Sequence, residues 1–131
     1  MTGGRVLVDT SAWIESIRAG GDERIGSAVA EATEDGRAVL CDMVLVELWN
    51  GAGSAADRRI LQTLEKELEC VPTTPEAWGL ARDMARQLRG RGVTLPAADL
   101  VIAACAERHG LALLHNDAHF EELLKHRKRR S

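Results

Sequence analysis

Four short apolar runs are spaced along the chain and predict β-strands. They cover residues 5–9, 37–42, 70–74 and 111–117. The first run is β-branched and ends abruptly in Asp9, while the last is leucine-rich and ends in a polar triplet that closes with Asp117. Short aliphatic stretches that stop at polar or turn-forming residues are typical of buried strands.

The segments between these runs have the spacing of helices. We expect helices over residues 10–20, 22–36, 42–53, 54–69, 74–92, 94–110 and 118–130. The composition of 42–53 also suits a strand, but Met43, Val44, Glu47 and Gly51 would stack on one face of a helix, so we favour a helix there. Strands that alternate with helices indicate an α/β fold with a parallel sheet covered on both faces.

The helix predicted over 94–110 carries an acid on its apolar face. Leu95, Ile102, Ala103 and Ala106 recur at helical spacing, and Asp99 lies among them. An ionised carboxylate that faces a core is costly unless a positive group meets it. We therefore expect Asp99 to meet a cation.

Composition and charge place the chain among globular proteins. Hydrophobic residues make up 45% and charged residues 28% of the chain, which is typical of globular proteins. Its 131 residues are enough to form one domain over 1–131. The formal net charge is −3, but the basic tail at 125–131 carries five of the 17 Lys and Arg and no acid. That tail could contact phosphates, yet a solvated and frayed terminus is the interpretation we favour.

The chain shows no sign of export or membrane insertion. No apolar run reaches the roughly 18 residues of a membrane span, and the N-terminal stretch does not resemble a secretory signal. Cys41, Cys70 and Cys105 fit neither a zinc pattern nor a disulfide framework. We expect a cytoplasmic protein without a membrane partner.

Four acids are candidates for a shared site: Asp9, Glu47, Asp99 and Asp117. Asp9 and Asp117 follow strand ends, where parallel sheets bind ligands. Each also has a structural alternative, because Asp9 and Asp117 could cap helices and Glu47 could be solvated. Only Asp99 has a poor alternative, since a first-turn acid gains little from the helix dipole when it faces the core.

Such a set of acids favours phosphoryl chemistry with a divalent cation. Clustered carboxylates repel one another unless cations lie among them, and hard oxygen ligands select Mg²⁺ or Mn²⁺. Aspartyl-phosphate hydrolases and receiver domains need a lysine near a strand end, and Lys66, Lys125 and Lys128 do not fit. Phosphodiester hydrolysis by a metal-activated water needs no lysine.

The chain resembles the PIN-domain ribonucleases, and within them the VapC-type toxins of toxin–antitoxin pairs. The resemblance rests on VLVDTSAWIE, LVELWNG, LPAADLVIAACAERHGLALLHND and DAHFEEL, which together run over nearly the whole chain. It implies a three-layer α/β/α sandwich with a short parallel sheet and an acidic pocket for Mg²⁺ or Mn²⁺. It also implies RNA cleavage that leaves a 5′-phosphate, inhibition by a cognate VapB-type antitoxin, and a homodimer.

The resemblance assigns the same four acids to catalysis and metal binding. It makes Asp9 and Asp99 the principal ligands, with Glu47 and Asp117 completing the set, and places Thr10 in the pocket as a polar contact. Many relatives carry a further acid where this chain has His119. We favour a surface role for that histidine, on the first turn of the last helix.

Other functions remain open on the sequence alone. The fold could serve as a catalytically silent binding module that acts with an antitoxin in transcriptional autoregulation, or the acids could serve a phosphatase or DNA nuclease. Arg86, Arg89 and Arg91 could hold substrate phosphates, although a solvated helix end is the interpretation we favour for them. We expect an apolar antitoxin patch near Trp13, Ile17, Leu48 and Trp49, and core packing for Trp78.

Overall fold

The computed structural model describes the backbone of residues 4–130 and the side chains of residues 4–127. Within this range the strands are β1 (Val6–Val8), β2 (Ala38–Cys41), β3 (Glu69–Val71) and β4 (Ala112–Leu114). The helices are α1 (Thr10–Ile17), α2 (Glu23–Glu34), α3 (Asp42–Gly51), α4 (Ala55–Glu67), α5 (Pro75–Gly90), α6 (Ala97–Arg108) and α7 (Ala118–Arg130). Every predicted element is present, and residues 42–53 are helical as we favoured.

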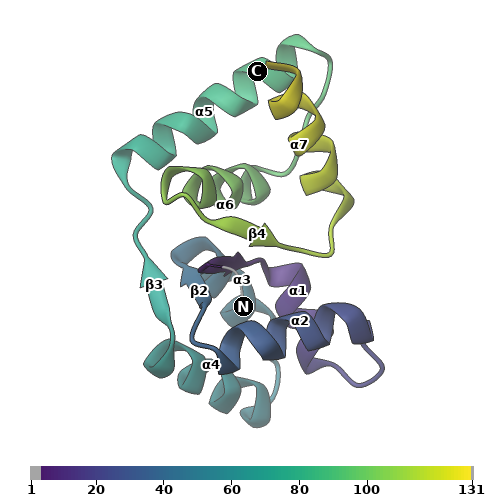
Figure 1. The fold of residues 1–131 in the computed structure, drawn as a ribbon, viewed down its shortest axis with the longest axis vertical. Coiled ribbons are helices and arrows are strands. Elements are labelled where there is room, and N and C mark those ends of the chain that lie inside the picture. Colours follow the sequence, from purple (N-terminus) through teal and green to yellow (C-terminus); the bar gives the residue numbers. More distant parts are fainter. Residues whose placement is uncertain (1–3, 131) are drawn as a thin grey trace.

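The strands form one parallel sheet in the order β3-β2-β1-β4. The chain first steps from β1 outward to β3, and then crosses back over the sheet to β4. Because such crossovers are right-handed, the reversal puts α5 and α6 on the face opposite to α1–α4. Figure 1 shows α1, α2 and α4 on one side of the strands and α5, α6 and α7 on the other, which gives the expected three-layer α/β/α arrangement.

Local sequence explains where the helices begin and end. Asp22, Ser54 and Thr74 each accept a hydrogen bond from a backbone N–H in the first turn of the helix that follows. Gly36 and Gly110 take positive φ angles of 71° and 65° just after α2 and α6, a conformation that glycine adopts without steric cost.

One strand lies slightly earlier in the chain than predicted. We expected the third strand over 70–74, but β3 spans Glu69–Val71 and pairs with β2 through Cys41 and Val71. Pro72, the next residue, has no N–H to donate to a ladder, which explains why the strand ends before it.

The main core lies between the sheet and its helices, and a second apolar cluster joins α5, α6 and α7. Trp13 is part of the main core, with 3% of its surface exposed. Trp78 is 44% exposed, so our expectation of core packing was wrong for this residue. The stripe of α5 that packs inward consists of Ala77, Ala81, Met84 and Leu88, and Trp78 falls outside it.

The basic tail was also predicted wrongly in its described part. Instead of fraying, residues 125–127 continue α7, and His126 is buried. Arg91 donates from Nη1 to the Nδ1 (3.0 Å) and to the carbonyl (3.1 Å) of His126, and Arg127 donates to both carboxylate oxygens of Glu107. The side chains of 128–131 lie outside the described residues. Among the helices described, none is both long and apolar enough to cross a membrane.

Candidate metal centre

Asp9 lies where β1 ends and α1 begins. Its Oδ2 accepts hydrogen bonds from the backbone N–H (3.0 Å) and the hydroxyl (2.6 Å) of Ser11, so Asp9 caps α1 as the structural alternative anticipated. Its Oδ1 is buried and has no hydrogen-bond partner among the described residues, although the residue is only 2% exposed. A buried carboxylate oxygen without a hydrogen-bond donor is costly. Capping of α1 therefore explains the position of Oδ2 but leaves Oδ1 unsatisfied.

Ser11 also joins the turns that follow β1 and β4. Its hydroxyl oxygen accepts a hydrogen bond from the backbone N–H of Asn116 (2.9 Å) while the hydroxyl donates to Asp9. The backbone N–H of Asp9 donates to the carbonyl of Leu114 at 2.9 Å, which continues the pairing of the two strands. Ser11 therefore holds Asp9 in one orientation beside the segment that carries Asp117.

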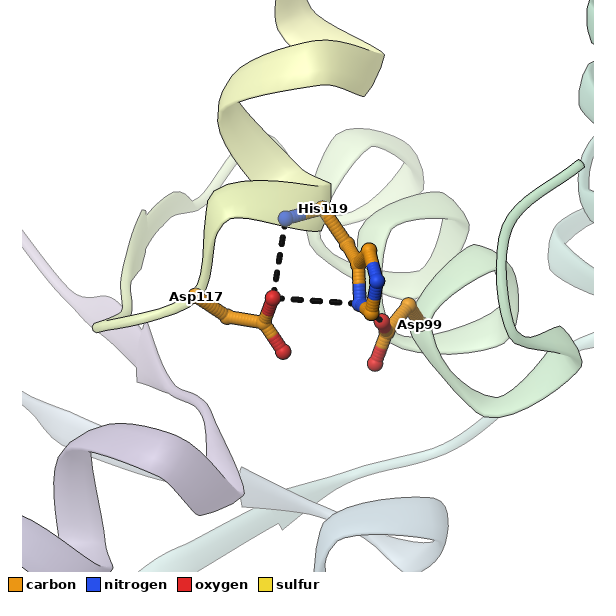
Figure 2. A group of neighbouring side chains, drawn as sticks. All are labelled: Asp99, Asp117 and His119. Carbon is orange, nitrogen blue, oxygen red and sulfur yellow. Dashed lines mark hydrogen bonds and ion pairs between the residues drawn. The ribbon is translucent and has the colours of Figure 1, made fainter. Parts of the chain in front are cut away.

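Asp99, Asp117 and His119 form a compact group (Figure 2). Asp117 Oδ1 accepts a hydrogen bond from the backbone N–H of His119 (2.8 Å) at the start of α7. The His119 Nδ1 lies 3.0 Å from Asp99 Oδ2 and 3.1 Å from Asp117 Oδ1. One potential ligand atom from each of the three residues lies within 4.8 Å of the other two.

The electrostatics of Asp99 show that three of the four acids are close neighbours. Burial, followed by the charges of Asp117 and Asp9, raises the pKa of Asp99 from 3.8 to about 6, and the hydrogen bond and charge of His119 oppose this rise. Desolvation and nearby carboxylates both disfavour the ionised form. A divalent cation among these groups would relieve both effects.

Glu47 reaches the site from α3 through Thr10. The hydroxyl of Thr10, the residue after Asp9, donates to Glu47 Oε1 at 2.7 Å. Glu47 is half-buried, and it also lines a groove of about 240 Å³ between α1, α3 and α4. It is not one of the three residues whose ligand atoms lie within 4.8 Å of one another, so it lies at the margin of the acidic group.

Two contributions to the site were missed by the sequence interpretation. His119 lies on the first turn of α7 with 48% of its side chain exposed, as expected, but its ring also bridges two of the acids, which we did not predict. Its position two residues after Asp117, in the first turn of a helix that Asp117 begins, was the available signal. Ser11 was not among the predicted site residues, because its link to Asn116 depends on the order of the strands in the sheet.

The arginines considered for substrate phosphates have different surroundings. Arg91 is turned inward onto His126, and Arg86 pairs with Asp83. Arg89 has a long contact, 3.5 Å, to the hydroxyl of Thr94. Of the three, Arg89 is the one least committed to another protein group.

Comparison with known proteins identifies the fold family. The family model described as PIN domain matches residues 6–125. This chain belongs to the PIN domain family. As a PIN domain it has its three close acids just after β1, on α6 and in the turn after β4.

Named relatives of this PIN domain are VapC ribonucleases. Ribonuclease VapC11 of Mycobacterium tuberculosis is 31% identical over 126 residues, covering 92% of each chain. Ribonuclease VapC21 of the same species is 35% identical over 95 residues, covering 69% of this chain and 67% of the relative. Among solved structures, DNA-bound VapBC from Salmonella typhimurium has a chain that is 26% identical, with a TM-score of 0.65 and 83% coverage of both chains.

The residues of this PIN domain fit a divalent cation. The potential ligand atoms are carboxylate oxygens and one imidazole nitrogen. At the same sheet edge, the buried Oδ1 of Asp9 has no hydrogen-bond partner among the described residues. Hard oxygen ligands of this kind suit Mg²⁺ or Mn²⁺. A cation there would neutralise the charges that raise the pKa of Asp99.

Proposed function

We propose that this PIN domain is a metal-dependent endoribonuclease and the toxin of a VapBC-type toxin–antitoxin pair. The observation that carries the proposal is the acidic group itself, in which Asp99, Asp117 and His119 place ligand atoms within 4.8 Å of one another. Burial, followed by the charges of Asp117 and Asp9, raises the pKa of Asp99 to about 6. The ribonuclease names of relatives at 31% and 35% identity support RNA as the substrate. Residues 1–131 would act as one domain.

Four acids would hold the cation: Asp9 and Asp99 as principal ligands, with Glu47 and Asp117 completing the set directly or through water. A Mg²⁺ or Mn²⁺ ion supplies the positive charge that polarises a phosphodiester oxygen and lowers the pKa of a water. Ser11 keeps Asp9 in place, and Thr10 does the same for Glu47. One of the four carboxylates accepts the proton of the attacking water, and the product keeps a 5′-phosphate.

The groove between α1, α3 and α4 is our proposed docking site for the antitoxin. Ile14, Ile17 and Ile60 line it and are 47%, 37% and 38% exposed, with Leu48 at its base. Similar solved structures include VapBC complexes, which supports a partner of this class. The patch expected from sequence shifts toward these isoleucines, because Trp13 is buried in the core.

The remaining features of the proposal are a homodimer and contact between RNA phosphates and basic residues. Arg89 is the candidate among the described residues, since Arg91 and Arg127 already bind protein groups, and the rest of the basic tail lies outside the described side chains.

The test of the proposal compares RNA cleavage by the wild type and Asp99→Asn with Mg²⁺, Mn²⁺ or EDTA. Asparagine keeps the shape of the side chain and removes its charge. Glu34→Gln, which changes an exposed acid on α2, is the matched control. We expect cleavage by the wild type and the control only with metal, and a loss of at least 100-fold, about 3 kcal/mol, in Asp99→Asn.

The same assay separates the alternatives. DNA and a small phosphomonoester, tested beside RNA, identify a DNA nuclease or a phosphatase if either is cut in preference to RNA. A wild type that cuts nothing with either metal, but binds the antitoxin, would be the silent binding module. Cleavage by Asp99→Asn at the wild-type rate would refute the proposed pocket.

A further inference from the structure

We infer that His119 is itself a ligand of the divalent cation and makes this site prefer a transition-metal ion, such as Co²⁺, to Mg²⁺. The inference rests on the proposed function in one respect only, namely that the acidic pocket holds a cation. It adds a nitrogen donor to a site that otherwise consists of oxygen ligands.

The first argument is the position of the imidazole. The Nδ1 atom is nearly equidistant from one oxygen of Asp99 and one of Asp117, at 3.0 and 3.1 Å. These acids come from different elements, α6 and the turn before α7. A nitrogen between two carboxylates, all within 4.8 Å, can share one ion with them.

The backbone holds the ring in this position. The N–H of His119 donates to the same Asp117 oxygen that its ring contacts, at 2.8 Å, so the turn and the ring are fixed by one carboxylate. Figure 2 shows the ring of His119 lying between the side chains of Asp99 and Asp117. The imidazole is therefore preorganised rather than free in solvent.

An independent observation comes from the other side of the site. Asp9 is 2% exposed, and its Oδ1 has no hydrogen-bond partner within the described residues. Asp9 is also close enough to Asp99 for its charge to raise the pKa of that residue. A buried anionic oxygen without a donor needs a cation, and this need does not depend on His119.

The donor set decides the metal preference. Mg²⁺ demands oxygen ligands and gives up its waters reluctantly, whereas imidazole favours ions later in the first transition row. A carboxylate at position 119 would leave a site of oxygen ligands alone. The histidine should therefore shift the preference away from Mg²⁺ without removing any of the acids.

A competing explanation of the same geometry makes His119 an internal counter-ion. In that case a protonated ring would bridge Asp99 and Asp117 only while metal is absent, and a bound ion would displace it. The two explanations differ in one observable, which is whether nitrogen contacts the bound metal.

The first experiment detects that contact directly. Mn²⁺ is added to the wild type, and pulsed electron paramagnetic resonance is used to look for hyperfine coupling to ¹⁴N. The variant is His119→Asp, and the control is His109→Gln, which removes an imidazole at the opposite end of α6, where Nε2 lies 2.7 Å from the Pro72 carbonyl. We expect coupling in the wild type and the control and its loss in His119→Asp.

Calorimetric titration with Mg²⁺ and with Co²⁺ measures the preference. We expect His119→Asp to keep its affinity for Mg²⁺, while the ratio of its Co²⁺ affinity to its Mg²⁺ affinity falls at least about tenfold. Tenfold is the lower end of the loss of metal affinity when even an indirect partner of a metal ligand is removed. Both variants change side chains that are not buried, and circular dichroism confirms their folding.

The outcomes separate this inference from the proposed function. One outcome is that Mn²⁺ binds the wild type without ¹⁴N coupling and binds Asp99→Asn only weakly. This result overturns the role of His119 and leaves the nuclease proposal intact. ¹⁴N coupling that persists in His119→Asp also overturns it. Coupling and altered preference in a protein that cuts no RNA would support the ligand and refute the nuclease.

Discussion

Replacing Asp99 by asparagine should stabilise the metal-free protein. The carboxylate has a pKa of about 6 in the folded chain against 3.8 as its ordinary value. At about 1.4 kcal/mol per pH unit, its ionised form is disfavoured by about 3 kcal/mol in the folded state. Because the asparagine side chain is neutral, we expect the free energy of unfolding to rise by about 2–3 kcal/mol at about pH 7.5 in EDTA.

The pH dependence has a definite sign. Between about pH 4 and pH 6 the folded chain holds a proton on Asp99 that the unfolded chain has released, so wild-type stability falls as the pH rises through this window. Below this window Asp99 is protonated in both the folded and the unfolded chain, and above it the folded chain bears the full cost of ionised Asp99. The gain from Asp99→Asn should therefore be near zero at about pH 4 and reach its maximum above about pH 6.

Metal should reverse the order of the two proteins. A ligand that binds only the folded state at 100 times its Kd adds about 2.7 kcal/mol to stability. Urea denaturation of the wild type and Asp99→Asn, at several pH values with EDTA or saturating Mn²⁺, measures both effects. A variant no more stable than the wild type in EDTA above the titration window would refute the argument that Asp99 is held among uncompensated charges.

Four further substitutions test the supporting structure. Ser11→Ala should lower the free energy of unfolding by about 1–2 kcal/mol, since it leaves a buried carboxylate oxygen with one donor fewer, and a neutral result would contradict the link between the two turns. Phe120→Ala should cost about 3–5 kcal/mol and Trp78→Ala less than about 1 kcal/mol, by urea denaturation, because only the phenylalanine is fully buried. Arg91→Ala should speed amide hydrogen exchange near His126 in α7, and unchanged protection there would show that this contact does not hold the helix.

The sheet edge at which the site forms was predictable from the sequence, for physical reasons. Short aliphatic runs that end in Asp9 and Asp117 favour strands followed by turns, and parallel strands bring such ends to one edge. Asp99 was recognisable as a charge within an apolar helix face. These signals are local and periodic, so no knowledge of tertiary contacts was needed to interpret them.

Two of the contacts that the sequence could not predict join distant parts of the chain. His119 contacts Asp99, 20 residues away, and the hydroxyl of Ser11 meets Asn116, 105 residues away. Trp78 was a different failure, since the stripe of Ala77, Ala81 and Met84 already marked the buried face and the hydrophobicity of tryptophan outweighed it. His126 was hidden within a basic composition that suggests solvent exposure.

The pairing of β1 with β4 has a consequence for biosynthesis. The first acid is made at residue 9, but the strand beside it and the residues that complete the pocket follow only after residue 111. Contacts at this sequence separation close late, because the intervening chain must first be ordered. A ribosome that has translated as far as β3 holds a chain with Asp9 and Glu47 but without Asp99, Asp117 or His119. The order of elements alone thus keeps these side chains from meeting until synthesis has passed the start of α7, so the proposed metal binding and RNA cleavage would have to wait until then.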